Sequence, residues 1–285
     1  MNVQQKVGAV VEAALRRPLQ PLSTLVFYRA LTAAVLLRVL LAWRSQAMIA
    51  GVHEFRIPDG RISGPLLWPA RFAAHHPHAF FLAVVVFLLV HLFLRCNYIT
   101  AILFSLLAFN LLIFTIPSGD GGDVLTFMLS LWAIFLIPAK SKSGLRPQTL
   151  LYNAARIGCM LQFVFLYAAS GADKIKSNVW TTGKAFDYMR YAGGMLNPDF
   201  PSFLATPLWD FAFSWSAILL ETLFGVLIWF RSCQPTLIFM AIAFHLGIWW
   251  MMDLGDFSRI MIVAVLIFIR DDQYAGMFRP ALLSA

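Results

Sequence analysis

Long runs of apolar residues without a charge limit what this chain can fold into. One such run extends from Cys96 to Gly119, and a helix needs only about 20 residues to cross a bilayer. Of the 285 residues, 60% are hydrophobic and 13% are charged, against about 45–50% and about 25% in soluble domains. A soluble domain of this size cannot bury that much apolar surface. The sequence therefore predicts an all-α protein that crosses a membrane several times.

Eight nearly uncharged runs predict a bundle of about eight transmembrane helices. Pro77 and Arg95 bound the second run, and Arg270 follows the last one. At about 20 residues per helix, eight crossings use about 160 residues, which leaves no room for a second large soluble domain. The predicted segments are 22–43, 78–94, 98–116, 124–138, 151–170, 209–230, 235–252 and 258–269.

The positions of Lys and Arg predict the orientation, because these residues concentrate in short cytoplasmic loops. The turns 117–123 and 253–257 contain aspartates but no Lys or Arg, so we expect them outside and both termini in the cytoplasm. The net charge of +8 then reflects topology, and nucleic acid is not an expected partner. The chain divides into a cytoplasmic amphipathic tail at 1–21, a transmembrane domain at 22–270 with extracytoplasmic loops at about 44–77 and 171–208, and a cytoplasmic tail at 271–285.

Several charged or polar side chains fall inside the predicted helices, among them Arg29, Arg38, Glu221 and His245. A charge at bilayer depth costs about 2.5–3.5 kcal/mol on insertion scales, so such groups face the bundle interior and pair. Two interpretations remain open: an Arg–Glu network that holds the helices together, or a polar cavity for a substrate or headgroup. His245 is correspondingly either a hydrogen-bonded core residue or a proton carrier.

The segment after the fifth predicted helix is the most informative, and it reads LQFVFLYAASGADKIKSNVWTTGKAFDYM from residue 161 to 189. The small residues Ser170-Gly171-Ala172 predict the end of the helix, which places Lys174 at the membrane interface. Desolvation favours the neutral amine of a lysine, which can accept a proton. The alternative is a lysine that extends to the headgroups, as we expect for Lys176 and Lys184. No short metal-binding motif is present, and no metal is predicted.

These residues resemble the signature of the HTTM membrane domain, which vitamin K-dependent gamma-carboxylase shares with the sporulation-delaying protein B family. The first motif, YAASGADKI, begins at Tyr167, and the second, WTTGKAFDY, begins at Trp180. Arg29 in LVFYRAL, Glu221 in the sixth predicted helix and His245 in AFHLGIWWMMDLGDFS are further matches. The resemblance extends over about residues 22–270, and the short chain is closest in size to the sporulation-delaying protein B branch.

The resemblance implies a site on the extracytoplasmic side of a bacterial plasma membrane. Lys174 would be the base that deprotonates a reduced quinone of the menaquinone or vitamin K type, with His245 as a second catalytic residue. The residues implied to bind the quinone are Arg29, Trp180, Gly183, Tyr188, Glu221 and Phe257.

Two functions stay open. The first is an epoxidase-like, oxygen-dependent oxidation of the quinol, linked to maturation of an exported peptide or toxin. The second is a non-enzymatic membrane partner that holds a secreted peptide for co-encoded maturation proteins. A transporter and a passive structural protein are further alternatives. Glutamate carboxylation is not expected, because the chain ends soon after the last predicted helix and the turn PSGDGGD lacks the histidine that the carboxylases carry there.

Overall fold

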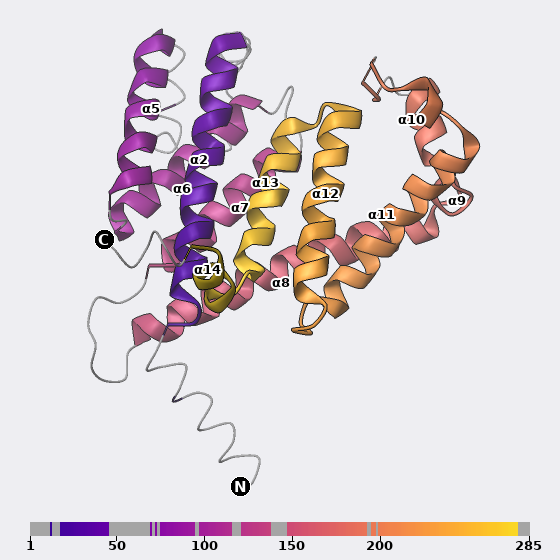
Figure 1. The fold of residues 1–285 in the computed structure, drawn as a ribbon. Coiled ribbons are helices and arrows are strands. Elements are labelled where there is room, and N and C mark those ends of the chain that lie inside the picture. The colour runs from indigo at the N-terminus through magenta and orange to yellow at the C-terminus, as the bar shows by residue number, and fades with distance from the viewer. Residues whose placement is uncertain are drawn as a thin grey trace, which may run out of the picture. The chain divides into compact units, whose positions relative to one another are not determined.

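The computed structural model describes residues 12, 18–45, 69, 72, 75–94, 97–115, 121–137, 147–192, 195–197 and 199–278. Within these ranges the protein is helical and contains no strand (Figure 1). Most of the predicted loop 44–77, most of the predicted tail 1–21 and residues 279–285 of the other predicted tail lie outside the described residues. The chain forms two compact units, Met1–Gly158 and Cys159–Ala285, which are described separately.

The first unit is made of apolar helices. They are α2 (Pro21–Ser45), α5 (Pro77–Phe93), α6 (Tyr98–Thr115), α7 (Gly121–Phe135) and the first part of α8 (Pro147–Lys176). Prolines begin α2, α5 and α8, because proline has a φ suited to the first helical position and needs no N–H partner there. Asn97 instead caps α6, since its Oδ1 accepts a hydrogen bond from the Thr100 amide at 3.0 Å. Helix α2 packs against α5, and α6 packs against α7.

A buried ion pair links two helices of the first unit. The Arg38 guanidinium on α2 donates to the Asp123 carboxylate at 2.7 Å. Asp123 lies in the first turn of α7, where a negative charge also complements the helix dipole. The Arg38 side chain therefore links α2 to α7, with an aspartate as its partner.

The second unit begins with the last part of α8. Its other elements are α9 (Asn178–Thr181), α10 (Ala185–Ala192), η1 (Ser202–Leu204), α11 (Pro207–Leu227), α12 (Gln234–Met252), α13 (Gly255–Val265), η2 (Leu266–Phe268) and α14 (Asp271–Phe278). Helices α12 and α13 lie side by side in Figure 1. The aromatic core joins α8, α11 and η2 through Phe163, Phe224 and Phe268, whose ring centroids lie 5.6–5.9 Å apart.

Among the described residues, four helical segments are long and apolar enough to cross a membrane: Pro21–Leu41, Pro147–Lys176, Pro207–Leu227 and Gln234–Met252. The apolar helices Pro77–Phe93, Tyr98–Leu112 and Gly121–Phe135 are shorter. Every predicted segment coincides with helix to within a few residues, except that α8 extends beyond the predicted segment 151–170 to Lys176. The prediction of a helical, membrane-compatible chain is confirmed, while the number of eight crossings and the orientation stay predictions.

The predicted helix end at Ser170-Gly171-Ala172 is wrong, because α8 continues without a break to Lys176. Gly171 instead lets another helix approach: a Cβ built on it would lie 2.8 Å from Thr222 Cγ2 and 3.0 Å from the Thr222 amide nitrogen. The small residues thus serve the packing of α8 against α11. The predicted loop 171–208 is also largely helical, since it contains α9, α10 and η1.

Candidate functional site

A buried ion pair between Lys174 and Glu221 forms the centre of the second unit's polar site. Lys174 Nζ donates to Glu221 Oε2 at 2.7 Å and to Oε1 at 2.9 Å. It also donates to Ser170 Oγ at 2.7 Å. The side chains of Lys174 and Glu221 are only 16% and 10% exposed. The structure therefore pairs Glu221 with a lysine, whereas the Arg–Glu network that remained one of the two interpretations of the sequence would pair it with an arginine.

The sequence of α8 explains why these groups meet. Tyr167, Ser170, Gly171 and Lys174 follow a spacing of three, four and seven residues, which places them on one face of a helix. Gly171 brings this face close to α11, since a Cβ there would lie 3.2 Å from the Glu221 carbonyl carbon. The close approach of the two backbones lets the Glu221 carboxylate reach Lys174.

Trp180 lies over the ammonium group of Lys174. The distance from Nζ to the ring centroid is 4.8 Å, within the range of a cation–π interaction. Trp180 belongs to α9, which follows α8 after Ser177, so the short connection sets the position of the ring. Trp180 also contacts Phe186 of α10 edge-to-face.

A cavity of about 370 Å³ opens beside the ion pair. Its polar wall contains Lys174, Glu221, Ser170 and Ser216, and most of its other walls are apolar. A largely apolar cavity with a few convergent polar groups is the usual form of a small-molecule site. The remaining lining residues are Trp180, Phe186, Met189, Phe213, Ala217, Ala243, Phe244, Gly247, Ile248, Met251, Met252, Leu254 and Phe257.

His245 lies behind the wall of this cavity. Its ring contacts Phe244 and Phe257 edge-to-face, and both of these residues line the cavity, whereas His245 does not. Its Nε2 forms a 2.7 Å hydrogen bond with the Tyr167 hydroxyl. Tyr167 and His245 are 1% and 2% exposed. The structure thus places the predicted catalytic His245 in a buried polar pair next to the cavity.

Gly183 and Tyr188 do not reach the ion pair. Gly183 has a φ of +77°, and a Cβ on it would lie 2.8 Å from Phe211 Cα, so glycine is needed for the turn from α9 to α10. Tyr188 is 61% exposed and lines a separate surface depression with Lys184 and Tyr191. Of the implied quinone-binding residues Trp180 and Tyr188, only Trp180 lies beside Lys174.

Arg29 belongs to the first unit, where it binds the end of a helix. Its guanidinium donates to the carbonyls of His91 at 3.2 Å and Leu94 at 2.8 Å. These carbonyls lie at the C-terminal end of α5, where no intrahelical donors remain. The geometry assigns Arg29 a capping role at the end of α5, within the first unit.

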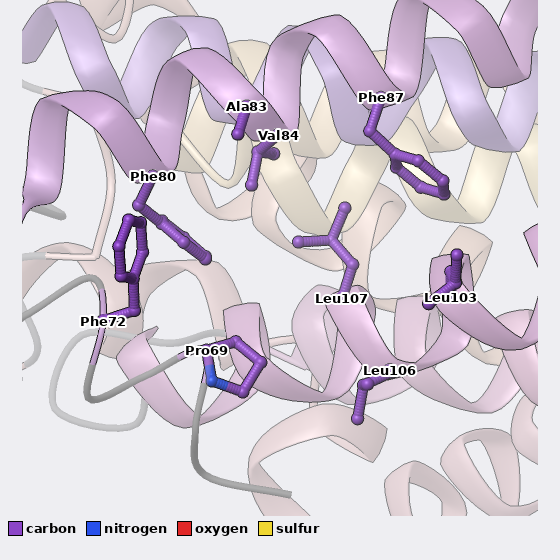
Figure 2. A pocket seen from close by; sticks show the side chains of 9 residues that line it. All are labelled: Pro69, Phe72, Phe80, Ala83, Val84, Phe87, Leu103, Leu106 and Leu107. Carbon is purple, nitrogen blue, oxygen red and sulfur yellow. The ribbon is translucent and has the colours of Figure 1, made fainter.

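The first unit has a cavity of its own, of about 350 Å³. Figure 2 shows apolar side chains of α5 and α6, with Pro69 and Phe72, around it. No charged or hydrogen-bonding side chain of the described residues lines this cavity, so it lacks groups for acid–base chemistry. No group of three possible metal ligands gathers anywhere within the described ranges.

Sequence reasoning identified Lys174, Glu221 and Trp180 but missed their arrangement. It also missed Ser170 as a ligand of the ammonium and Tyr167 as the partner of His245. The spacing of Tyr167, Ser170 and Lys174 on one helix face could have indicated Ser170, had the helix been extended past Gly171. No family model, curated protein or solved structure matches this chain.

Proposed function

We propose that the second unit binds a reduced quinone of the menaquinone or vitamin K type and removes a proton from it. One observation carries this proposal: a lysine–glutamate pair lies in the wall of an apolar, aromatic cavity. The pair supplies acid–base groups, and the cavity supplies a surface for a flat apolar ring. The two motifs that resemble the HTTM domain, around Lys174 and Trp180, support the choice of a quinone.

The residues fit such a ligand. Its hydroxyl group can meet Lys174, Glu221 and Ser170, while its ring packs against side chains such as Phe213 and Met251. The volume of about 370 Å³ falls in the range of about 300–1,000 Å³ common for ligand sites. A reduced quinone dissolves in the hydrocarbon of the bilayer, and a protein with membrane-spanning helices can take it up from there.

Lys174 acts as a base only after it has lost a proton. A protonated lysine has three N–H donors and no lone pair, and in the observed pair Nζ donates to Ser170 and to both oxygens of Glu221. Transfer of one proton to Glu221 gives a neutral amine and a neutral acid. This form avoids the cost of keeping two charges in a poorly solvated site. The amine then accepts the ligand's hydroxyl proton, and the electron pair of the broken O–H bond stays on the ligand oxygen.

The chemistry that a reduced quinone supplies is oxidation by dioxygen, in which one quinol and one O₂ give a quinone epoxide and water. We propose that this oxidation is linked to maturation of an exported peptide or toxin. We also propose that the site faces the outside of a bacterial plasma membrane, which the Lys and Arg distribution supports. Glutamate carboxylation is not part of the proposal.

A non-enzymatic peptide partner is the second candidate function. Tyr188, Tyr191, Phe203 and Leu208 are all exposed, and they belong to the segment 171–208. Exposed apolar side chains that gather in one segment are typical of a binding surface. In this alternative a secreted peptide binds there, and Lys174 and Glu221 serve only to hold α8 against α11.

The test is oxidation of reduced menaquinone by the protein purified in lipid nanodiscs under oxygen, with the epoxide detected by mass spectrometry. We expect epoxide from the wild type and none from Lys174→Ala. Lys176→Ala is the matched control, because Lys176 lies on the same helix end but is exposed and does not line the cavity. Absence of epoxide from folded wild-type protein would reject the enzymatic proposal. Photo-cross-linking of a co-expressed peptide from Tyr188 and Tyr191 would then test the second candidate.

A further inference from the structure

The buried pair of Tyr167 and His245 is close to the ion pair on the same side of α8. Tyr167 precedes Lys174 by two helical turns, and its ring packs against Phe224 of α11 at a tilt of 30°, with centroids 4.5 Å apart. Phe224 lies one turn after Glu221 on α11. Gly171, one turn after Tyr167, lies against the backbone of Glu221, since a Cβ there would be 3.2 Å from the Glu221 carbonyl carbon. The turn of α11 that carries Glu221 therefore packs against the stretch of α8 between Tyr167 and Lys174.

The hydrogen bond between Tyr167 and His245 can run in either direction. Tyr167 donates to Nε2 when the imidazole proton is on Nδ1, and Nε2 donates to the Tyr167 oxygen when the proton is on Nε2. In the second arrangement the hydroxyl hydrogen of Tyr167 is free to turn toward Glu221. Both arrangements are electrically neutral. The O–H dipole of Tyr167 points toward His245 in the first arrangement and toward Glu221 in the second.

Nothing among the described residues fixes the tautomer of His245, because its buried Nδ1 has no hydrogen-bond partner there. His91, in the first unit, is different. Its Nε2 is bonded to the Tyr28 hydroxyl at 3.0 Å and its Nδ1 to the Thr32 hydroxyl at 3.2 Å. His91 is thus held at both ring nitrogens, while His245 is held at one. Only the surrounding charge remains to select the His245 tautomer.

We propose that the Tyr167–His245 pair is a reversible dipole whose direction follows the charge on Glu221. When Glu221 is a carboxylate, His245 carries its proton on Nε2 and Tyr167 turns its hydroxyl hydrogen toward Glu221. When Glu221 is neutral, Tyr167 donates to His245, which carries its proton on Nδ1. The change releases one proton from Nε2 to water and takes up one proton at Nδ1, which requires a local opening because His245 does not line the cavity, and it leaves the net charge of the pair unchanged.

This inference deepens the proposed function and rests on it, because the dipole has a role in catalysis only where Lys174 and Glu221 act as the proposed base. A base that works through Glu221 must let that residue gain and lose a proton in a poorly solvated place. A neutral dipole that reverses can stabilise both the ionised and the protonated form of Glu221 without burying a further charge. Tyr167 and His245 are then positioning residues, because they act on the ligand through Glu221 and Lys174.

The test is ¹⁵N NMR of ligand-free protein with labelled histidine, in which protonated and unprotonated ring nitrogens have different chemical shifts. Wild-type His245 is expected to be mainly the Nε2–H tautomer. In Glu221→Leu, which removes the charge and the acceptor, the major tautomer is expected to reverse to Nδ1–H. Glu221→Gln keeps the shape of the side chain and is expected to change the ratio in the same direction if the leucine variant does not fold.

His91 is the internal control, since both its nitrogens are engaged and its tautomer is expected to stay the same in all variants. The signal of His245 is identified by its loss in His245→Gln. An unchanged His245 tautomer in a folded Glu221 variant, or a charged imidazolium in the wild type, would overturn the proposal. Because no quinone is present, these outcomes do not depend on the epoxide assay, and either proposal can fail without the other.

Discussion

Gly171 leaves no room for a side chain between α8 and α11, because a Cβ would lie 3.0 Å from the Thr222 amide nitrogen. We expect Gly171→Val to force the two helices apart and to lower the stability by about 1–3 kcal/mol, as overpacking does. The Lys174–Glu221 pair would lengthen as well. Thermal unfolding in detergent measures the first effect. Gly247→Ala is the control, because its Cβ would meet only Met251 Cε at 3.6 Å, and equal losses in both variants would contradict the prediction.

The Lys174–Glu221 pair predicts a strong coupling between its two members. Removing one partner of a buried ion pair costs about 3–5 kcal/mol, because the other charge is left uncompensated. We therefore expect Lys174→Met and Glu221→Leu each to destabilise the protein, and the double variant to be more stable than either single one. A double-mutant cycle from chemical unfolding in detergent checks this. Additive losses would mean that the two side chains do not interact.

A substitution at Gly183 is expected to change the position of Trp180. Its φ of +77° and its contact with Phe211 make Gly183→Ala strained, at a cost of about 1–2 kcal/mol for the left-handed conformation alone. We expect the turn between α9 and α10 to shift and Trp180 to move away from Lys174. In single-tryptophan variants that keep Trp180, this appears as a change in its emission maximum. An unchanged emission maximum and melting temperature would show that the turn tolerates a side chain.

The proposed orientation predicts which residues an impermeant thiol reagent reaches in intact cells. In a chain whose native cysteines are replaced, Lys184→Cys is expected to react from outside, because it belongs to the segment 171–208. Arg231→Cys is expected to react only after the cells are opened. Arg231 is exposed and lies in the turn between α11 and α12. The opposite labelling pattern would place the Lys174 site on the cytoplasmic side.

The helices could be predicted from the sequence because apolar runs and their bounding prolines are local signals. The end of α8 was not predicted correctly, since Ser170-Gly171-Ala172 reads as a break until α11 is known to pack there. Lys174 and Glu221 each stood out as a charge in an apolar segment, but their sequence positions are 47 residues apart. Only the tertiary structure brings them together. The position of Tyr188 was also not predicted, because the turn at Gly183 directs its side chain to the surface.

The cavity of the second unit has a consequence for the kind of molecule that it admits. Among the described residues that line it, Lys174 and Glu221 are the charged ones, and they neutralise each other. An ionic compound would leave water and find no unmatched counter-ion to replace its hydration. A neutral, oil-soluble compound loses little on entry and gains the hydrogen-bonding groups of Lys174, Glu221, Ser170 and Ser216. The cavity thus favours neutral over ionic ligands, and a ligand that loses its proton inside is held by the Lys174–Glu221 pair that accepted the proton.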